Sequence, residues 1–303
     1  MPQTLPFPRR INVELTNYCN QRCPLCPRQG LTRPLGFMDA ELFERIAAEC
    51  AGQATRLWLH FLGEPLLHRQ TVAFIRRAKQ LGVREVGLST NGLALGSHTD
   101  ALLDCGLDRL ECSLDADDRE AYAQMRGRDH FERVSENLRH FLTRKRQLGC
   151  ERPQTSIQFM RTPAVEARLA QVVAAWRPLL GPADFIMTIE PASFLGAVGG
   201  GAPVGGAPLT RPPCRWLFES MMILQDGTVT MCGADWDASA PLGNLHQSTI
   251  ADLWQGAELE RRRQLHRAGD FAALSACAAC EDWRLADGSG YVNVLAAVDA
   301  AAK

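Results

Sequence analysis

Hydrophobic and polar residues follow two different periods along the chain. Short β-branched and aliphatic runs begin near residues 11, 56, 85, 109, 154 and 183, and such runs are typical of strands. Between them, apolar residues recur every three or four positions over 39–51, 69–82, 130–149 and 165–181, as in amphipathic helices. Six β–α units in series predict an α/β fold, with a parallel sheet curled into a partial (β/α)6 barrel like an incomplete TIM barrel.

Glycine and proline interrupt this alternation over residues 196–213, where neither a helix nor a central strand is expected. This stretch predicts a linker, either passive or lying over the site, between a barrel domain at 1–195 and a smaller domain at 214–303. Residues 221–232 of the smaller domain read as a hairpin that turns at Asp226-Gly227. Short helices are expected over 249–267.

Composition excludes several classes of protein. The 303 residues are 46% hydrophobic with a formal net charge of -1, which is enough for a core and gives no basic footprint for nucleic acid. The N-terminus lacks a signal sequence, and no apolar run is long enough to span a membrane. We therefore expect a soluble cytoplasmic protein with no nucleic-acid or membrane partner. In such a chain, eleven cysteines indicate metal ligands or catalytic thiols more than disulfides.

Three cysteines, Cys19, Cys23 and Cys26, directly follow the first predicted strand in the stretch CNQRCPLC. In parallel α/β barrels the carboxyl ends of the strands carry the chemistry. Three thiolates hold three irons of a four-iron cubane and leave the fourth iron open to a small molecule. A structural zinc site would need a fourth ligand, and His60 and His68 lie at no finger-like spacing.

This C-x3-C-x2-C stretch resembles the cluster motif of the radical S-adenosylmethionine (SAM) superfamily. The resemblance implies a [4Fe–4S] cluster whose open iron holds SAM, cleavage to a 5′-deoxyadenosyl radical, and an external one-electron reductant such as a flavodoxin or ferredoxin. One position departs from the family, because Leu25 replaces the usual aromatic residue before the third cysteine. An aliphatic contact with the adenine is expected there.

The resemblance extends through residue 191 and marks further cofactor-binding positions at the ends of later strands. Glu64 is expected to accept a hydrogen bond from the ammonium of SAM, and Arg126 to pair with its carboxylate. Taken singly, these charges could also be a helix cap and a solvated side chain. The full expected set for the cofactor is Leu25, Gly63, Glu64, Asn91, Ser113, Asp115, Arg126 and Gln158.

A second group of cysteines comprises Cys214, Cys232, Cys277 and Cys280. Four thiolates saturate either a four-iron cluster or a zinc ion, and spacing alone does not separate the two metals. The pattern resembles the twitch domain, a short form of the SPASM extension. That resemblance implies an auxiliary [4Fe–4S] cluster that takes up the electron left on an oxidised substrate.

Enzymes of the twitch group that act on aminocyclitols and sugars include dehydrogenases and epimerases, and epimerases need a thiol hydrogen donor. The spare cysteines Cys50, Cys105, Cys112 and Cys150 are expected to point away from the site, which favours a dehydrogenase. Its substrate would be a small, cationic polyol, such as an aminocyclitol, aminoglycoside or sugar intermediate of antibiotic biosynthesis. The candidate catalytic residues are Glu190 as general base, with Asp235 and His60 as alternatives.

Two other functions stay open at this stage. A SPASM-type peptide maturase is one, although only eighteen residues precede Cys19, too few for the leader-binding domain that such enzymes often carry. A metal-binding or redox-sensing protein without catalysis is the other. The presence of Glu64 and Arg126 favours an enzyme.

Overall fold

Ten strands form one continuous sheet in the computed structural model, which describes residues 2–199, 211–286, 288 and 290–295. The middle of the predicted linker and the last eight residues of the sequence lie outside the described residues. The strands are β1 (Arg10–Val13), β2 (Arg56–Leu59), β3 (Glu85–Thr90), β4 (Arg109–Ser113), β5 (Gln154–Met160), β6 (Phe185–Ile189), β7 (Ser220–Ile223), β8 (Thr228–Thr230), β9 (Gly243–Asn244) and β10 (Tyr291–Asn293).

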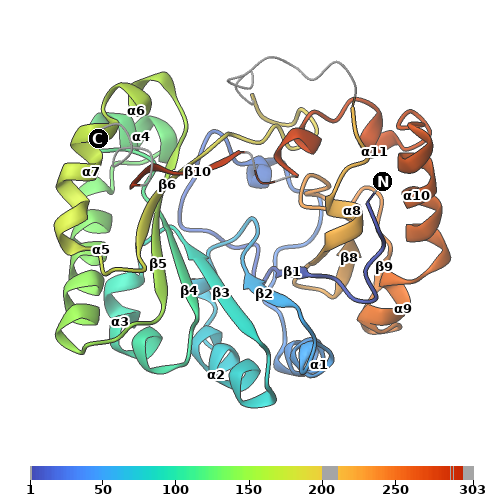
Figure 1. The fold of residues 1–303 in the computed structure, drawn as a ribbon, viewed down its shortest axis with the longest axis horizontal. Helices are drawn as coiled ribbons and strands as arrows, with labels where there is room; N and C mark the ends of the chain where they lie inside the picture. The colour runs from blue at the N-terminus through green and yellow to red at the C-terminus, as the bar shows by residue number, and fades with distance from the viewer. Residues whose placement is uncertain (1, 200–210, 287, 289, 296–303) are drawn as a thin grey trace.

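The first six strands lie side by side in chain order, and all are parallel. They curl around a central space (Figure 1), which confirms the predicted partial (β/α)6 barrel. β7 extends the same sheet by pairing in parallel with β1, so that Arg10 faces Ser220 and Val13 faces Ile223. The strands on both sides of the predicted linker are therefore joined edge to edge, and the division into two domains stays a prediction.

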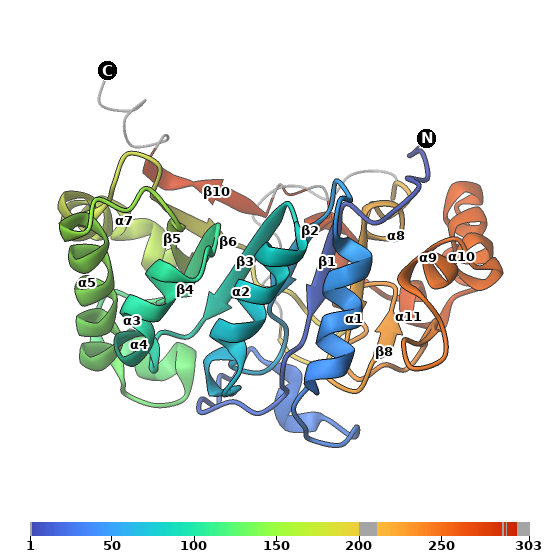
Figure 2. The same ribbon diagram turned by 90° about the horizontal axis from the view of Figure 1, so that it is seen from below.

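Helices cover the outer face of the curled sheet (Figure 2). The longer ones begin and end at recognisable signals: the Asp39 side chain caps α1, and α2 ends at Gly82 in the left-handed conformation. No helix in the described part of the chain is long and apolar enough to cross a membrane. The helices are α1 (Ala40–Cys50), α2 (Thr71–Leu81), α3 (Leu95–Asp104), α4 (Arg119–Arg126), α5 (Phe131–Gln147), α6 (Pro163–Ala167), α7 (Leu169–Trp176), α8 (Trp216–Glu219), α9 (Ile250–Trp254), α10 (Ala257–Ala268) and α11 (Ser275–Ala278).

Successive side chains of a strand point alternately to the apolar layer between the sheet and the helices and to the interior of the barrel. In β1, Ile11 and Val13 are fully buried in the layer between the sheet and the helices. Because successive side chains of a strand point to opposite faces, Arg10 and Asn12 face the interior, where they line a cavity. The aliphatic residues thus build the core, and the polar residues of the same strand are left for the site.

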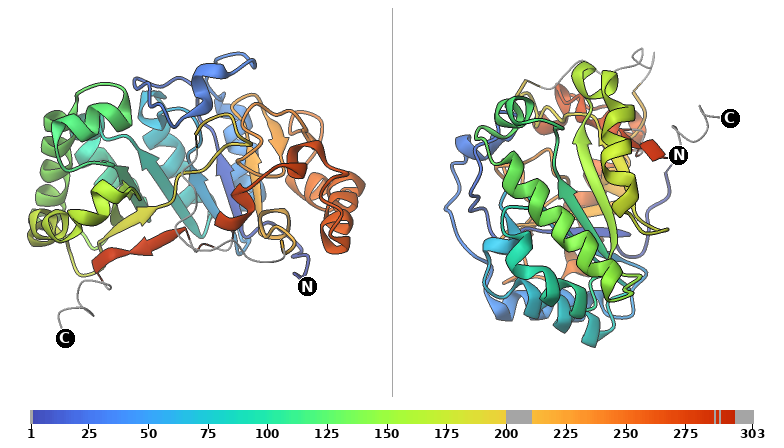
Figure 3. Two further views of the ribbon diagram at one scale, coloured as in Figure 1. Left: turned by 90° about the horizontal axis from the view of Figure 1, so that it is seen from above. Right: turned by 90° about the vertical axis from the view of Figure 1, so that its left-hand side faces the viewer.

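The cysteine-rich C-terminal region lies at one edge of the sheet, and β10 returns to the other edge (Figure 3). The predicted hairpin is confirmed: β7 and β8 are antiparallel, and Gly227 adopts a φ of 83° at the turn. The predicted short helices are α9 and α10. β10 was not predicted, and it pairs antiparallel with β6, with Tyr291 opposite Ile189.

A buried ion pair fixes the long loop that carries the first cysteines. Both guanidinium Nη atoms of Arg33 donate to the Glu14 carboxylate at 2.6 and 2.7 Å, and the Glu14 side chain is 0% exposed. Arg33 also donates to the Gln225 side chain and to the Trp236 carbonyl oxygen. The pair therefore links β1, the cysteine loop and the chain after β7.

Replacing Arg33 by methionine should destabilise the protein by about 3–5 kcal/mol, because it leaves an unpaired buried carboxylate. Burial already raises the pKa of Glu14, against the opposing effect of Arg33. Protonation of Glu14 relieves the unpaired charge, so the loss of stability should be smaller at about pH 5 than at about pH 8. Denaturant unfolding at the two pH values measures both effects.

A matched control is Arg77→Met, which removes another arginine–glutamate pair. Arg77 and Glu44 are joined by comparable hydrogen bonds, but their side chains are 46% and 42% exposed. Solvent screens such a pair, so the expected loss of stability is much smaller than that of Arg33→Met. Equal losses in the two variants would contradict the role given to the Glu14–Arg33 pair.

Candidate active site

The three N-terminal cysteines occupy a loop directly beyond the carboxyl end of β1. Cys19, Cys23 and Cys26 all line one cavity, and the backbone N–H of Cys26 donates to the Cys23 carbonyl oxygen at 3.1 Å, closing a tight turn. Burial raises the pKa of Cys26 to about 11, and the nearby Cys23 and Cys19 thiols add to the rise. The loop thus brings all three thiols to the wall of one cavity, although no three His, Cys, Asp or Glu side chains of the described residues stand at metal-binding distances from one another.

Two side chains reach the thiols, one directly after β3 and one at the end of α4. The Asn91 side-chain Nδ2 lies 3.8 Å from the Cys19 Sγ, and the Arg126 Nη1 lies 3.8 Å from the Cys23 Sγ. N–H groups aimed at sulfur stabilise its thiolate form. The Arg126 Nε is buried without a hydrogen-bond partner, a polar atom left available beside the thiols. These observations fit an iron–sulfur cluster with a polar ligand beside it.

Glu64 sits at the end of β2 with its carboxylate already held in place. It accepts hydrogen bonds from the backbone N–H of Leu66 and Asn91 and from the Thr90 hydroxyl, at 2.7 to 3.0 Å. Burial raises the pKa of Glu64, while these donors act in the opposite direction. Neighbouring Gly63 is required for a different reason, because a Cβ there would lie 1.9 Å from the Thr16 carbonyl oxygen.

Arg126 is fixed by the turn that follows β4. It pairs with Asp115 at 2.6 Å and donates to the Ser113 carbonyl oxygen at 2.6 Å. Burial lowers the pKa of Arg126, but the negative charges of Asp115 and the Cys23 sulfur raise it by more. The pKa of Arg126 is therefore held above its usual value. Asp115 adopts a φ of 62°, a strained conformation for a residue with a side chain. The ion pair holds this turn against the strain.

The cavity has a volume of about 610 Å³, within the range of small-molecule sites. All the residues expected for the cofactor line it together with the three cysteines: Leu25, Gly63, Glu64, Asn91, Ser113, Asp115, Arg126 and Gln158. The structure therefore brings the whole predicted set together. Their roles toward a cofactor remain predictions.

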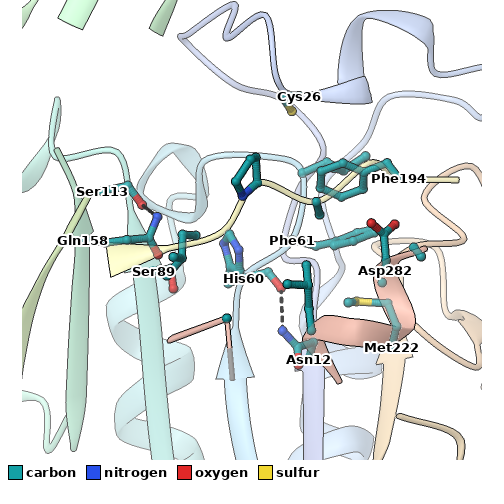
Figure 4. Close-up of a pocket in the computed structure, with 18 of the residues that line it drawn as sticks. Asn12, Cys26, His60, Phe61, Ser89, Ser113, Gln158, Phe194, Met222 and Asp282 are labelled. Carbon is teal, nitrogen blue, oxygen red and sulfur yellow. Dashed lines mark hydrogen bonds between the residues drawn. The ribbon is translucent and has the colours of Figure 1, made fainter. Parts of the chain in front are cut away.

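Below the cysteines the interior of the barrel is polar. Figure 4 shows His60, Ser89 and Gln158 on one side of the space, with Cys26 above them and Phe61 and Asp282 on the other side. Gln158 donates to the Ser113 hydroxyl at 3.3 Å, and Asn12 donates to the carbonyl oxygen of His60 at 3.5 Å. Such groups suit a ligand that carries several hydroxyl or amino groups.

The three candidate catalytic residues have different surroundings. Glu190 lines the cavity and lies 3.3 Å from the Arg161 guanidinium. His60 also lines it, but burial and the charges of Arg10 and Arg126 lower its pKa to about 4, which makes it a weak proton acceptor at neutral pH. Asp235 does not line the cavity; its carboxylate accepts three hydrogen bonds from Ser239 and Ala240. The structure gives Asp235 the role of a loop cap.

Each of the four C-terminal cysteines lies close enough to at least one other for their thiols to interact electrostatically. The Cys277 and Cys280 thiols help to raise the pKa of Cys214. The Cys214 and Cys277 thiols help to raise the pKa of Cys232. Burial raises the pKa of Cys214 to about 12 and that of Cys277 to about 11. Cys232 also lines the cavity, so the second thiol set borders the space that holds the first.

The spare cysteines lie elsewhere. Cys50, Cys105 and Cys112 are buried, and Cys150 is half-buried. Cys112 lies on the helix side of β4, where a Cβ on Gly92 would meet its sulfur at 3.0 Å. The cavity lining described for this chain includes none of the four, as the sequence predicted.

Sequence reasoning missed several residues that the structure brings to these sites. Asn12 lines the cavity, and the polar alternation of β1 could have identified it. Asp282 accepts hydrogen bonds from the backbone N–H of Ser193 and Leu195 and so ties the C-terminal region to the end of β6. His266 lies between two cysteines of the second group. No local pattern marks Asp282 or His266.

Comparison with known proteins agrees with this geometry. Residues 13–146 match the family model described as the radical SAM superfamily, and residues 214–281 match the SPASM model, described as an iron–sulfur cluster-binding domain. The chain thus combines a radical SAM region with a SPASM region. The resemblance seen in the cysteine motifs is thereby confirmed for both cysteine groups. The two matched regions are those of a radical SAM cluster and of an auxiliary iron–sulfur cluster.

A curated relative and two solved structures illustrate the likeness. GTP 3′,8-cyclase of Chlorobaculum tepidum is 35% identical over 133 residues, which is 44% of this chain and 40% of that protein. BtrN in complex with AdoMet and 2-DOIA superposes with a TM-score of 0.63 at 18% identity, covering 93% of this chain and 94% of BtrN. SuiB of Streptococcus suis gives a TM-score of 0.70 at 14% identity, covering 91% of this chain and 72% of SuiB.

These similarities cover different shares of the proteins compared. The radical SAM protein described here matches only about two fifths of the length of its curated relative. The solved structures share its fold, with the partial barrel followed by a C-terminal hairpin region. Both support a radical SAM enzyme of the SPASM or twitch type.

Replacing Cys23 by alanine should remove one cluster and leave the other. Iron content should fall from about eight to about four atoms per chain, because each four-iron cluster depends on its own thiolates. Cys112→Ala is the matched control, since this buried thiol belongs to neither set, and it should keep the full content. Anaerobic reconstitution followed by iron and sulfide analysis measures the result. Unchanged iron in Cys23→Ala would contradict the assignment.

The metal-free protein should react slowly with iodoacetamide at Cys26. A pKa of about 11 leaves the protonated thiol in excess at neutral pH, and only the thiolate reacts. Alkylation should therefore be at least about tenfold slower than that of a free cysteine, and it should accelerate as the pH rises. Mass spectrometry of the Cys26 peptide follows the rate, with urea-unfolded protein as the control. Equal rates in folded and unfolded protein would refute the effect of burial.

Proposed function

We propose that this chain is a radical SAM dehydrogenase that oxidises a carbinol of a small polyol to a ketone. The observation that carries the proposal is the shared cavity, in which Glu190 and a set of polar side chains lie together with the three N-terminal cysteines. The spare thiols lie outside the lining, so the site offers a carboxylate to accept a proton and no spare thiol to return a hydrogen.

When bound, the N-terminal cluster with SAM supplies a 5′-deoxyadenosyl radical, and the auxiliary cluster supplies an acceptor for one electron. Oxidation of a carbinol to a ketone removes a hydrogen atom from carbon, a proton from oxygen and one electron. The protein must therefore hold the carbon beside the cysteine loop and take the proton. Glu190 is the proposed acceptor of that proton, and Arg161, 3.3 Å away, orients its carboxylate.

Polar groups along the interior of the barrel are proposed to hold the substrate. Asn12, Ser89 and Gln158 lie within one cavity and offer donors and acceptors for several hydroxyl groups. These side chains come from strands, so their positions are set by the sheet. A ligand held in this way is fixed in one orientation relative to the cysteine loop.

Charge in the cavity favours a substrate with an amino group near the reacting carbon. With Glu64 assigned to SAM and Asp115 paired with Arg126, Glu190 is the strand-end carboxylate left to attract an ammonium group of the substrate. Arg10 and Arg56 line the opposite ends of β1 and β2 and would repel it. We therefore propose an aminocyclitol, an aminoglycoside or an amino sugar, as made in antibiotic biosynthesis, with a flavodoxin- or ferredoxin-type protein as the reductant.

Two related functions are the alternatives. An epimerase would need a hydrogen donor, and the positions of the spare cysteines argue against one. A peptide maturase of the SPASM type would need a site for an extended chain. SuiB has been solved bound to the precursor peptide SuiA, but the lining of the cavity in this chain offers several separate polar contacts that suit a compact ligand better.

The deciding experiment incubates the anaerobically reconstituted, reduced protein with SAM and a panel of aminocyclitols. A dehydrogenase forms ketone and 5′-deoxyadenosine in equal amounts, detected by mass spectrometry. Incorporation of solvent deuterium without oxidation would replace the proposal by epimerisation. Turnover of a peptide in place of the aminocyclitols would replace it by maturation.

Glu190→Gln should lower ketone formation about 100-fold, the lower end of the range for removing a general base. Formation of 5′-deoxyadenosine should fall much less, because the amide leaves the cysteine loop intact. The ratio of the two products therefore reports the loss of proton transfer. Asp235→Asn serves as the control, since Asp235 caps a loop outside the cavity lining, and it should keep a ratio near one. A parallel fall of both products in Glu190→Gln would refute the role of Glu190.

A further inference from the structure

His266 is held between two cysteines that come from different segments. It lies in the last turn of α10 and is 1% exposed. Its Nδ1 is 3.2 Å from the backbone nitrogen of Cys214, and its Nε2 is 3.4 Å from the Cys277 Sγ. The Phe271 ring packs edge-on against the imidazole at 5.0 Å, so the ring orientation is fixed on both sides.

These contacts determine which nitrogen carries the proton. The backbone N–H of Cys214 can only donate, so Nδ1 of His266 must accept and is unprotonated. The proton of the neutral ring is then on Nε2, which points at the Cys277 sulfur. His266 is therefore a donor of an N–H···S hydrogen bond to a cysteine of the second group.

A half-buried cation, Arg211, reinforces this arrangement. Arg211 donates to the Cys277 carbonyl oxygen at 2.7 Å, and its guanidinium carbon lies 4.3 Å from the centre of the Phe271 ring. Its positive charge favours the thiolate forms of Cys214, Cys277 and Cys280 and so opposes the rise of their pKa values that burial causes. The Arg211 Nε is buried without a hydrogen-bond partner. The second cysteine group thus has both a hydrogen-bond donor and a positive charge on one side.

We infer that His266 and Arg211 raise the reduction potential of the auxiliary cluster and so make it a better electron acceptor. A reduced cluster carries one more negative charge than the oxidised form. A hydrogen bond to its sulfur ligand and a nearby cation therefore stabilise the reduced form more. His266 acts through the Cys277 sulfur, and Arg211 acts through its charge beside the Cys214, Cys277 and Cys280 sulfurs. The link to substrate oxidation rests on the proposed function, whereas the effect on the potential does not.

The test is a redox titration of the auxiliary cluster followed by electron paramagnetic resonance. The full-length chain carries Cys19→Ala, Cys23→Ala and Cys26→Ala, so that only the C-terminal cluster titrates. Replacing His266 by leucine should shift the equilibrium about tenfold toward the oxidised form, which lowers the midpoint potential by about 59 mV for one electron. Arg211→Met should shift it in the same direction.

Conservative and distant variants separate hydrogen bonding from packing. His266→Gln keeps an N–H donor on a side chain of similar length, so it should retain a midpoint closer to that of the parent than His266→Leu does. His246→Leu changes an exposed histidine of the same region and should leave the midpoint unchanged. Equal shifts in His266→Leu and His266→Gln, or no shift at full iron content, would overturn the inference.

A measurement without a variant at His266 covers the case in which His266→Leu fails to assemble its cluster. In the same Cys→Ala background, ¹⁵N-histidine labelling should give a coupling between one nitrogen and the reduced cluster in pulsed resonance spectra. The absence of that coupling would overturn the inference. None of these measurements uses SAM or a substrate, so a failure here is distinct from a failure of the dehydrogenase proposal.

Discussion

The Glu14–Arg33 ion pair is the contact on which the arrangement of both cysteine groups depends. A carboxylate without solvent exposure is tolerated only with a partner that satisfies its oxygens, and Arg33 reaches it from the cysteine loop. The same loop is tied to the segment after Cys232, because Asp237 accepts hydrogen bonds from the Thr32 backbone and hydroxyl at 2.9 and 2.6 Å. The first cysteine loop, β1 and the second cysteine region are therefore positioned as one unit.

The open form of the barrel explains why the site is polar. A closed barrel of this kind fills its interior with packed aliphatic side chains, whereas here six parallel strands leave a cavity lined by Asn12, His60, Ser89 and Gln158. The aliphatic residues of these strands are used on the helix side instead. The helix side of the sheet supplies the apolar packing, and the cavity side carries the polar groups of the site. Such polar groups would be costly to bury in a dry core.

Much of the fold and of the cofactor site could be predicted from the sequence, for physical reasons. Short β-branched and aliphatic runs marked all six barrel strands, and the parallel order places their carboxyl ends at one edge. Residues as distant in the chain as Glu64 and Gln158 could therefore be assigned to one site. The cysteine spacing was sufficient for the first metal group because all three ligands lie in one loop.

The parts that could not be predicted depend on contacts between distant segments. His266 gains its role only because α10 brings it between Cys214 and Cys277. The sequence does not show that the Asp235 carboxylate bonds to Ser239 and Ala240, because this contact depends on the conformation of the loop after Cys232. The short strand β10 carries too few residues to show a period, and its pairing with β6 is set by the shape of the sheet edge.

The position of β10 has a consequence for the wall of the cavity. Tyr291 of β10 forms part of that wall, and the strand lies at the end of the sheet beside β6. This side of the cavity therefore depends on a strand of three residues that follows all seven cysteines of the two groups along the chain.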